Sequence, residues 1–113
     1  MAKVSKFSPR KKTTVSRKKR DGNKTSEILI YRDKNIVVDT ASHFIFIGKL
    51  QEIGDYFMTL ADVDVHDRNE SPSMNEKYIM DSKKYGVRCN RRLVHVRLEE
   101  VISVSLLDDV IEY

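Results

Sequence analysis

Cysteine is nearly absent from this 113-residue chain, which holds only Cys89. A single cysteine excludes an intramolecular disulfide and any metal site built from several cysteines, so we expect a reducing, intracellular compartment. Long apolar runs are also absent: none approaches the roughly 20 residues of a membrane span, and residues 1–24 contain no signal-peptide core. We therefore expect no membrane partner and a cytoplasmic protein, or a nuclear one in a eukaryote.

Signatures of catalysis and of metal binding are lacking as well. The chain has no Gly-rich phosphate loop, no nucleophile elbow and no paired carboxylates at catalytic spacing. Its three histidines, His43, His66 and His95, fall in different predicted elements. The acids around His66 are interpreted as a solvated strand end, with weak cation binding as the alternative. The sequence thus predicts neither an enzyme nor a metal or other cofactor.

Positive charge is concentrated at the N-terminus. Residues 1–24 hold ten Lys or Arg against one Asp, a net charge of +9, whereas the remaining chain holds 11 against 16 acids, a net charge of −5. Such an arm cannot bury apolar surface and is predicted to be disordered in isolation. Two clusters in it are predicted to bind nucleic-acid phosphates by releasing condensed counterions. They consist of Arg10, Lys11 and Lys12, and of Arg17, Lys18, Lys19 and Arg20.

Other interpretations of the arm stay open. It fits a solubilising tail, a segment that folds back on the acidic body, or a nuclear localisation signal. Nucleic-acid contact is the interpretation that we favour.

The body of the chain alternates apolar and polar residues, as β-strands do. Strands are predicted at 36–40, 44–50, 56–66, 93–98 and 101–107. In the third, Phe57, Thr59, Ala61, Val63 and Val65 are expected on one face and Met58, Leu60, Asp62 and Asp64 on the other. Such bent antiparallel strands suit a small SH3-like barrel, a mainly β fold.

Glycine and polar residues mark the bends between these strands. Gly48 and Gly54 are expected at bends because glycine accepts a positive φ without a Cβ penalty. A polar insertion over 67–92 is predicted to contain a short helix at 74–84. Ser73 and Glu76 have the spacing of a capping box there, and Gly86 can close the C-terminus of the helix.

The stretch from Gly48 to Leu60 carries the most informative pattern, Gly-x-Leu-x-x-Ile-x-Asp-x-x-Met-x-Leu. It resembles the first motif of the Sm and Sm-like (LSm) RNA-binding proteins. The run Val-Arg-Leu-Glu-Glu-Val over 96–101 stands where the second motif would lie. The resemblance implies a ribonucleoprotein component with an Sm-like β-barrel over 25–108, a disordered arm over 1–24 and a tail over 109–113. It also implies a short helix near 28–31, capped at Thr25 or Ser26, where local propensity favours a strand equally.

The resemblance implies a base-binding site. Phe57 matches the residue that stacks on a base, and Arg97 matches the cation that packs on the base from the other side. Asp55 matches the acid that orients the turn through backbone amides. Thr59 stands where the family has Asn, and because a hydroxyl offers fewer hydrogen bonds than an amide, weaker base discrimination is expected. Leu98 replaces a glycine and resists a positive φ.

Alternatives for these residues follow from the sequence too. Phe57 and Met58 also fit plain core positions. Arg97 also fits an ion pair with Glu99, with Glu100 or with an acid of a neighbouring subunit. If these alternatives hold, the chain retains less of the base site that the resemblance implies.

The partner implied by the resemblance is single-stranded, uridine-rich RNA. DNA is a variant of this hypothesis because the arm contacts phosphate and not sugar. The alternative class is an SH3-like protein-interaction module with a vestigial RNA site.

The resemblance further implies a homo-oligomeric ring of six or seven subunits, in which strands four and five pair between neighbours. Residues 102–106 form such an edge with few charges to blunt it. A monomer whose tail over 108–113 covers this edge is the competing expectation.

Overall fold

The computed structural model describes residues 27–69 and 75–112. Three sequence predictions fall on residues outside these ranges. They are the disordered arm over 1–24, the helix cap at Thr25 or Ser26, and the Ser73 half of the capping box.

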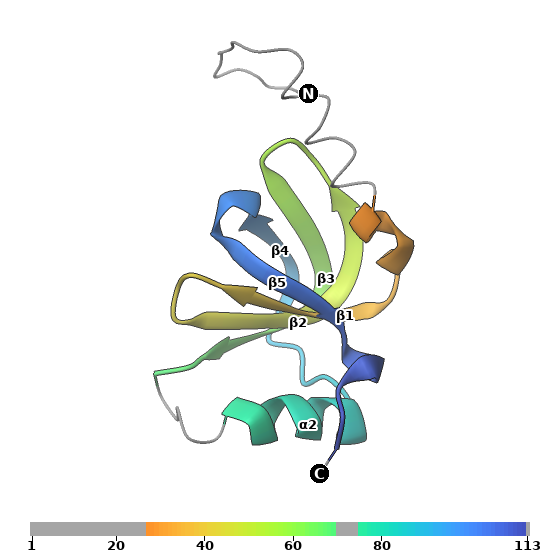
Figure 1. Ribbon diagram of the computed structural model, residues 1–113, viewed down its shortest axis with the longest axis vertical. Coiled ribbons are helices and arrows are strands. Elements are labelled where there is room, and N and C mark those ends of the chain that lie inside the picture. The colour runs from red at the N-terminus through yellow and green to blue at the C-terminus, as the bar shows by residue number, and fades with distance from the viewer. Residues whose placement is uncertain (1–26, 70–74, 113) are drawn as a thin grey trace.

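Five antiparallel strands form one strongly bent sheet, which confirms the predicted fold class (Figure 1). The strands are β1 (Asn35–Thr40), β2 (Phe44–Ile53), β3 (Phe57–Asp67), β4 (Arg91–Arg97) and β5 (Val101–Leu106). They are arranged in the order β4-β3-β2-β1-β5. Within the described chain, β4 and β5 are therefore the two edge strands, each paired with one neighbour only.

The main core is built from side chains of four strands. Ile36, Val38, Leu50, Met58, Leu60 and Val63 are fully buried, and Val96 is 4% exposed. Residues 27 and 28 are helical and lead into a single turn of 3-10 helix, η1 (Leu29–Tyr31), so a short helix precedes β1 as the resemblance implied. Ile28 and Tyr31 pack against this core from that side.

The predicted face assignment along β3 is wrong beyond Ala61. Met58 and Leu60 share one face, as expected, and that face is buried, but the next buried residue is Val63, where strict alternation would place Asp62. Asp62 has a φ of 52° and lies in a β-bulge, at which the pairing with β2 shifts. A bulge adds one residue to a strand and so exchanges the two faces beyond it.

Gly48 is required for close packing and not for a bend. Gly54 lies in the turn between β2 and β3 as predicted, but neither Gly48 nor Gly54 has the positive φ that the sequence prediction assumed. A Cβ on Gly48 would lie 2.9 Å from Val63 Cγ2 and 3.1 Å from the carbonyl oxygen of Ala61. Glycine therefore lets β2 approach the bulge of β3 more closely than any other residue allows.

A helix, α2 (Asn75–Tyr85), lies in the predicted insertion and matches its expected position to within one residue at each end. Gly86 has a φ of 100°, and its N–H donates to the Ser82 carbonyl at 3.0 Å, so it closes the helix as predicted. None of the described helices is both long and apolar enough to span a membrane.

The helix builds a second core on the other face of β1 and β2. Val37, Ile45, Ile47, Ile79 and Leu107 form this cluster, and β1 is thus buried on both faces. Leu107 begins a 3-10 turn, η4 (Leu107–Asp109), which leads to a C-terminal segment beside α2 (Figure 1).

The C-terminal segment therefore does not cover the edge of β5. Its Val110 packs against the second core, and Lys83 of α2 donates a hydrogen bond to the Val110 carbonyl. Within the described part of the chain, up to residue 112, this is contrary to the expectation of a tail that shields β5.

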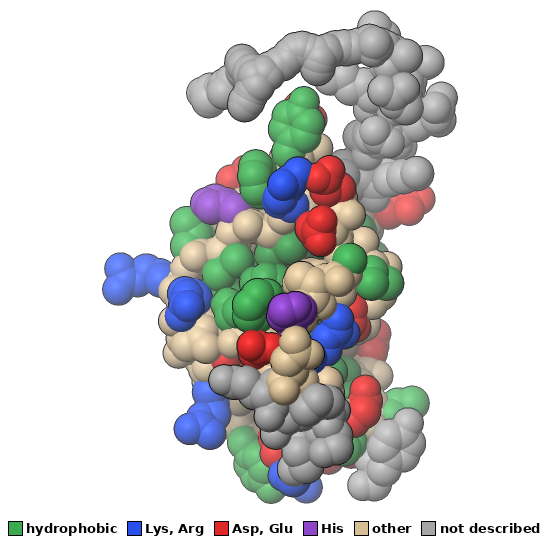
Figure 2. Space-filling view, turned by 90° about the vertical axis from the view of Figure 1, so that its left-hand side faces the viewer, with side chains coloured by type: hydrophobic (Ala, Val, Ile, Leu, Met, Phe, Trp, Pro, Cys, Tyr) green, Lys and Arg blue, Asp and Glu red, His purple; other side chains and the backbone are tan. Residues whose placement is uncertain are grey.

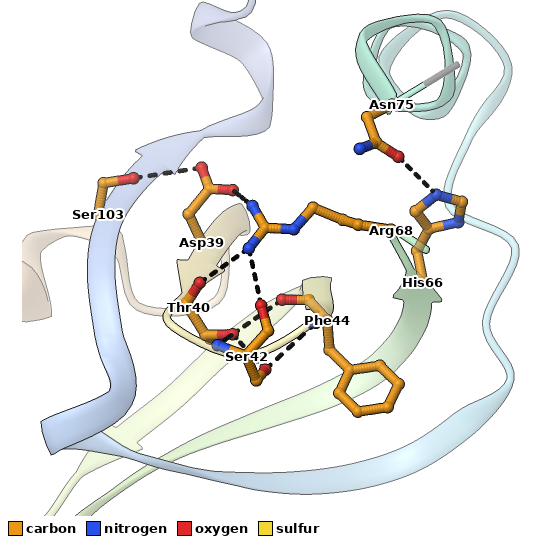
Figure 3. Close-up of polar contacts among 8 residues, drawn as sticks. All are labelled: Asp39, Thr40, Ser42, Phe44, His66, Arg68, Asn75 and Ser103. Atoms are coloured by element: carbon orange, nitrogen blue, oxygen red, sulfur yellow. Dashed lines mark hydrogen bonds and ion pairs between the residues drawn. The ribbon is translucent and has the colours of Figure 1, made fainter. Parts of the chain in front are cut away.

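Arg68, directly after β3, connects the end of β3 with β1 and with the turn between β1 and β2 (Figure 3). Its guanidinium donates to the carbonyls of Thr40 at 3.0 Å and Ser42 at 2.7 Å and lies 3.5 Å from the Asp39 carboxylate. Asp39 in turn accepts a hydrogen bond from Ser103 of β5 at 3.2 Å. The planar, multivalent donor set of arginine suits this position.

Candidate nucleic-acid interface

Phe57 and Arg97 lie directly opposite each other on β3 and β4. Phe57 opens β3 and is 46% exposed, whereas the adjacent Met58 is fully buried. The alternative of a core position thus holds for Met58 and not for Phe57. Directly opposed residues in antiparallel strands have Cβ atoms about 4.5–5.5 Å apart, so the ring and the guanidinium share one small surface.

Thr59 and His95 form the next cross-strand pair on the same face. The Thr59 hydroxyl lies 3.0 Å from His95 Nδ1, and the His95 ring packs edge-on against Phe57 with ring centres 6.4 Å apart. His95 is exposed, as the sequence predicted. The face therefore presents two rings, one hydroxyl and one guanidinium, which is the combination that stacks on and hydrogen-bonds to unpaired bases.

Two turns beside this face are held together by backbone hydrogen bonds. The Gly54 N–H donates to the Phe57 carbonyl at 2.8 Å, which closes the β2–β3 turn. The Leu98 N–H donates to the carbonyl of Tyr56 at 2.8 Å, so the β4–β5 turn lies against the β2–β3 turn. Residues from both motifs are thus fixed relative to one another.

Leu98 fits its turn without a positive φ. It begins a 3-10 turn, η3 (Leu98–Glu100), and only Asp33 and Asp62 among the described non-glycine residues have positive φ values. Its half-buried side chain packs against the main core. The turn thus differs from the glycine geometry that the resemblance implied, and Leu98 contributes packing instead.

Asp55 is exposed in the β2–β3 turn. In the described ranges its carboxylate makes no hydrogen bond to the backbone amides of the turn, which the Gly54–Phe57 bond closes instead. Its part in binding remains a prediction from the sequence.

Arg97 makes an ion pair with Glu99, one of the partners expected as an alternative. Both side chains are exposed, at 62% and 63%. Exposed pairs of this kind contribute about 0–1 kcal/mol, because water screens both charges. The guanidinium can therefore exchange Glu99 for another hydrogen-bond acceptor at little cost.

The structure brings together Phe57, Thr59 and Arg97, with Asp55 in the adjacent turn. The predicted arm residues Arg10, Lys11, Lys12, Arg17, Lys18, Lys19 and Arg20 lie outside the described residues.

Sequence reasoning missed one residue of this face. His95 was expected to be exposed, but its place beside Phe57 depends on the β3–β4 register. Tyr56, in the adjacent turn, is also 68% exposed, and its only signal in the sequence was an aromatic residue beside the predicted turn.

No three His, Cys, Asp or Glu side chains are grouped so as to hold a metal ion within residues 27–69 and 75–112. His66 instead stacks on Tyr78, with ring centres 3.8 Å apart, and lies 3.2 Å from the Asn75 side-chain oxygen.

Comparison with solved structures identifies an Sm protein of Pyrococcus abyssii in complex with a uridine heptamer. It is 19% identical to this chain, and the match covers 72% of this chain and 93% of the Sm protein at a TM-score of 0.50. The likeness establishes an Sm-like fold. No family model matches the chain, and no curated protein matches it.

Proposed function

We propose that this protein is a divergent member of the Sm-like family that binds single-stranded, uridine-rich RNA. In this proposal a base stacks on Phe57 and contacts Arg97, and Thr59 hydrogen-bonds to the base edge. The basic arm over 1–24 adds affinity that does not depend on sequence. The protein acts as a binding scaffold and not as an enzyme.

One observation carries the proposal: Phe57 and Arg97 are exposed and opposed on adjacent strands, at the point where two turns meet. An exposed aromatic ring is a stacking surface worth about 1–3 kcal/mol per base. The fold likeness to an Sm protein in complex with a uridine heptamer supports RNA as the partner.

A ring of identical subunits is part of this proposal. Its support is the pair of free edges, β4 and β5, at opposite ends of the sheet in the described chain. Each edge strand carries an exposed apolar residue, Leu93 at 53% and Ile102 at 69%. Pairing β4 of one copy with β5 of the next would satisfy both edges and bury these side chains.

The direct test of the base site compares uridine and adenosine oligonucleotides. Phe57→Ala and Arg97→Ala should each reduce the preference for uridine, and the arm should maintain a weaker, salt-sensitive binding to both. Thr59→Val, which removes the hydroxyl, should reduce the preference less. Circular dichroism first establishes that the variants fold. Wild-type protein that binds neither oligonucleotide at low salt would overturn the proposal.

A protein-interaction module is the second candidate, and the acidic surroundings of Arg97 favour it. Glu99 pairs with the guanidinium, and Glu100 and Asp55 lie in the two turns nearby. Such a module would bind a protein partner equally well without residues 1–24, and both alanine variants would bind RNA as wild type does.

A further inference from the structure

A second concentration of positive charge lies in the folded body, away from Phe57. The run over 83–92 contains five Lys or Arg and no acid, and it leads from the last turn of α2 into the start of β4. Four of these side chains are exposed, and three of them define what we call the basic surface: Lys84, Arg88 and Arg91. The fourth, Arg92, follows Arg91 in β4 and therefore faces the other side of the strand. Figure 2 shows Lys and Arg side chains projecting along the left-hand side of the molecule.

The basic surface has no acidic partner within the described chain. None of its three cations forms an ion pair there, whereas Lys49, Arg68, Lys77 and Arg97 all do. Two nearby acids are engaged elsewhere. Asp81 pairs with Lys77 at 2.8 Å, and Asp64 accepts a hydrogen bond from Asn90 at 3.1 Å.

Helix stability explains only part of this charge. A lysine in the last turn of a helix interacts favourably with the helix dipole, which accounts for Lys84. Arg88 and Arg91 lie beyond the helix. Three unpaired cations on one surface repel one another, so the arrangement indicates an anionic partner.

The basic surface also carries a ring and connects to the base site. Tyr85 is 76% exposed, and Lys84 Nζ lies 5.7 Å from its ring centre. Along β4, alternate residues share a face, so Arg91 lies on the same side of the strand as Arg97. At about 3.3 Å per residue, this face bridges roughly 20 Å from the base site to the basic surface.

We propose that an RNA strand bound at Phe57 and Arg97 continues along this face of β4, with its phosphates against the basic surface and a base on Tyr85. This inference rests on the proposed function and extends it to a second, sequence-independent contact region. Cations and an aromatic ring on one surface are the features with which proteins bind single strands irrespective of base.

Salt dependence of binding tests the inference in the full-length protein. The variant Lys84→Gln/Arg88→Gln/Arg91→Gln is compared with wild type on a 20-nucleotide oligouridine. Each lost phosphate contact lowers the slope of log affinity against log salt by about 0.7 for a single strand, so three contacts lower it by about 2. The uridine preference should be unchanged, because Phe57 is intact.

The control is Lys34→Gln/Lys49→Gln, which removes two exposed lysines outside the basic surface, one just before β1 and one in β2, and it should keep the wild-type slope. A three-residue variant that also keeps that slope would overturn the inference and leave the proposed function intact. Failure of the proposed function is seen separately, as the absence of uridine preference in wild type.

The only cysteine gives an independent measurement, since Cys89 is exposed within the basic surface. A saturating 20-nucleotide oligouridine should slow alkylation of Cys89 by a maleimide several-fold. A uridine trinucleotide, too short to extend beyond the base site, should not. Equal alkylation rates with and without the longer strand would contradict the inference.

Discussion

The backbone N–H of Leu98 donates to the carbonyl of Tyr56 at 2.8 Å, and this bond joins the two turns beside the proposed base site. Tyr56 precedes Phe57, and Leu98 follows Arg97, so the bond lies next to both residues proposed to hold a base. The Leu98 side chain anchors the same turn in the main core.

Replacing Leu98 by glycine, the residue that the family resemblance implies here, should therefore destabilise the protein. The change removes half-buried apolar packing and adds backbone freedom, with an expected loss of about 1–3 kcal/mol in the free energy of unfolding. Urea denaturation measures it. Equal or greater stability of the Leu98→Gly variant would contradict the packing role.

Gly48→Ala should destabilise the sheet, and Gly54→Ala is its control. The new Cβ at Gly48 would meet Val63 Cγ2 at 2.9 Å, whereas at Gly54 the nearest atom is 3.7 Å away. Overpacking of a core typically costs about 1–3 kcal/mol. Because Gly54 has no positive φ, alanine there should be neutral or slightly stabilising. Similar midpoints for the two variants in thermal unfolding would count against the close approach of β2 and β3.

Arg68→Lys should cost more stability than Arg32→Lys. A lysine cannot donate in several directions from one plane, so the carbonyls of Thr40 and Ser42 lose their partner, at an expected cost of about 1–3 kcal/mol. Arg32 makes one exposed hydrogen bond, to the Gln51 carbonyl at 2.9 Å. Chemical denaturation compares the two variants, and equal losses would show that the Arg68 contacts contribute little.

Tyr78 should make the stability depend on alkaline pH. Burial of its hydroxyl and the neighbouring Asp64 raise its pKa in the folded protein, and the hydroxyl makes no hydrogen bond of ordinary geometry in the described chain. The raised pKa means that the stabilisation is complete below the unfolded pKa of about 10 and is lost as the pH rises above it.

Tyr78→Phe removes this dependence and an unsatisfied buried hydroxyl. The variant should be at least as stable as wild type at pH 7, and its free energy of unfolding should fall less steeply between pH 9 and 11, by up to about 1.4 kcal/mol per pH unit. Tyr85→Phe, at an exposed ring, should follow the wild-type curve. A Tyr78→Phe variant that is less stable at pH 7 would mean that the hydroxyl has a partner.

Much of the fold could be predicted from sequence because local signals agreed. Alternation placed all the strands, and the glycine at Gly86 placed the end of α2. The face assignment failed at Asp62. Alternation assumes a regular strand, and no residue pattern around Asp62 indicated a bulge. The competing expectation, a tail that covers β5, was wrong because the packing of Val110 near α2 depends on apolar residues distant in the chain, such as Ile79.

The sequence motif predicted which residues belong to the candidate site but not how they are placed. Phe57, Thr59 and Arg97 were named from the resemblance, but whether Phe57 is core or surface depends on the face that β3 turns inward. The β3–β4 register places Phe57 opposite Arg97. It also brings His95 into contact with Thr59 and Phe57. Register is set by tertiary pairing and is not visible in either motif alone.

Photo-cross-linking tests the central claim most directly. A short oligouridine carrying 4-thiouridine is irradiated with the full-length protein, and the attached residues are located by peptide mass spectrometry. The account predicts cross-links in the β2–β3 and β4–β5 turns, at or next to Phe57 and Arg97, and their loss in Phe57→Ala/Arg97→Ala. Cross-links confined to residues 1–24 would contradict a base site in the folded body.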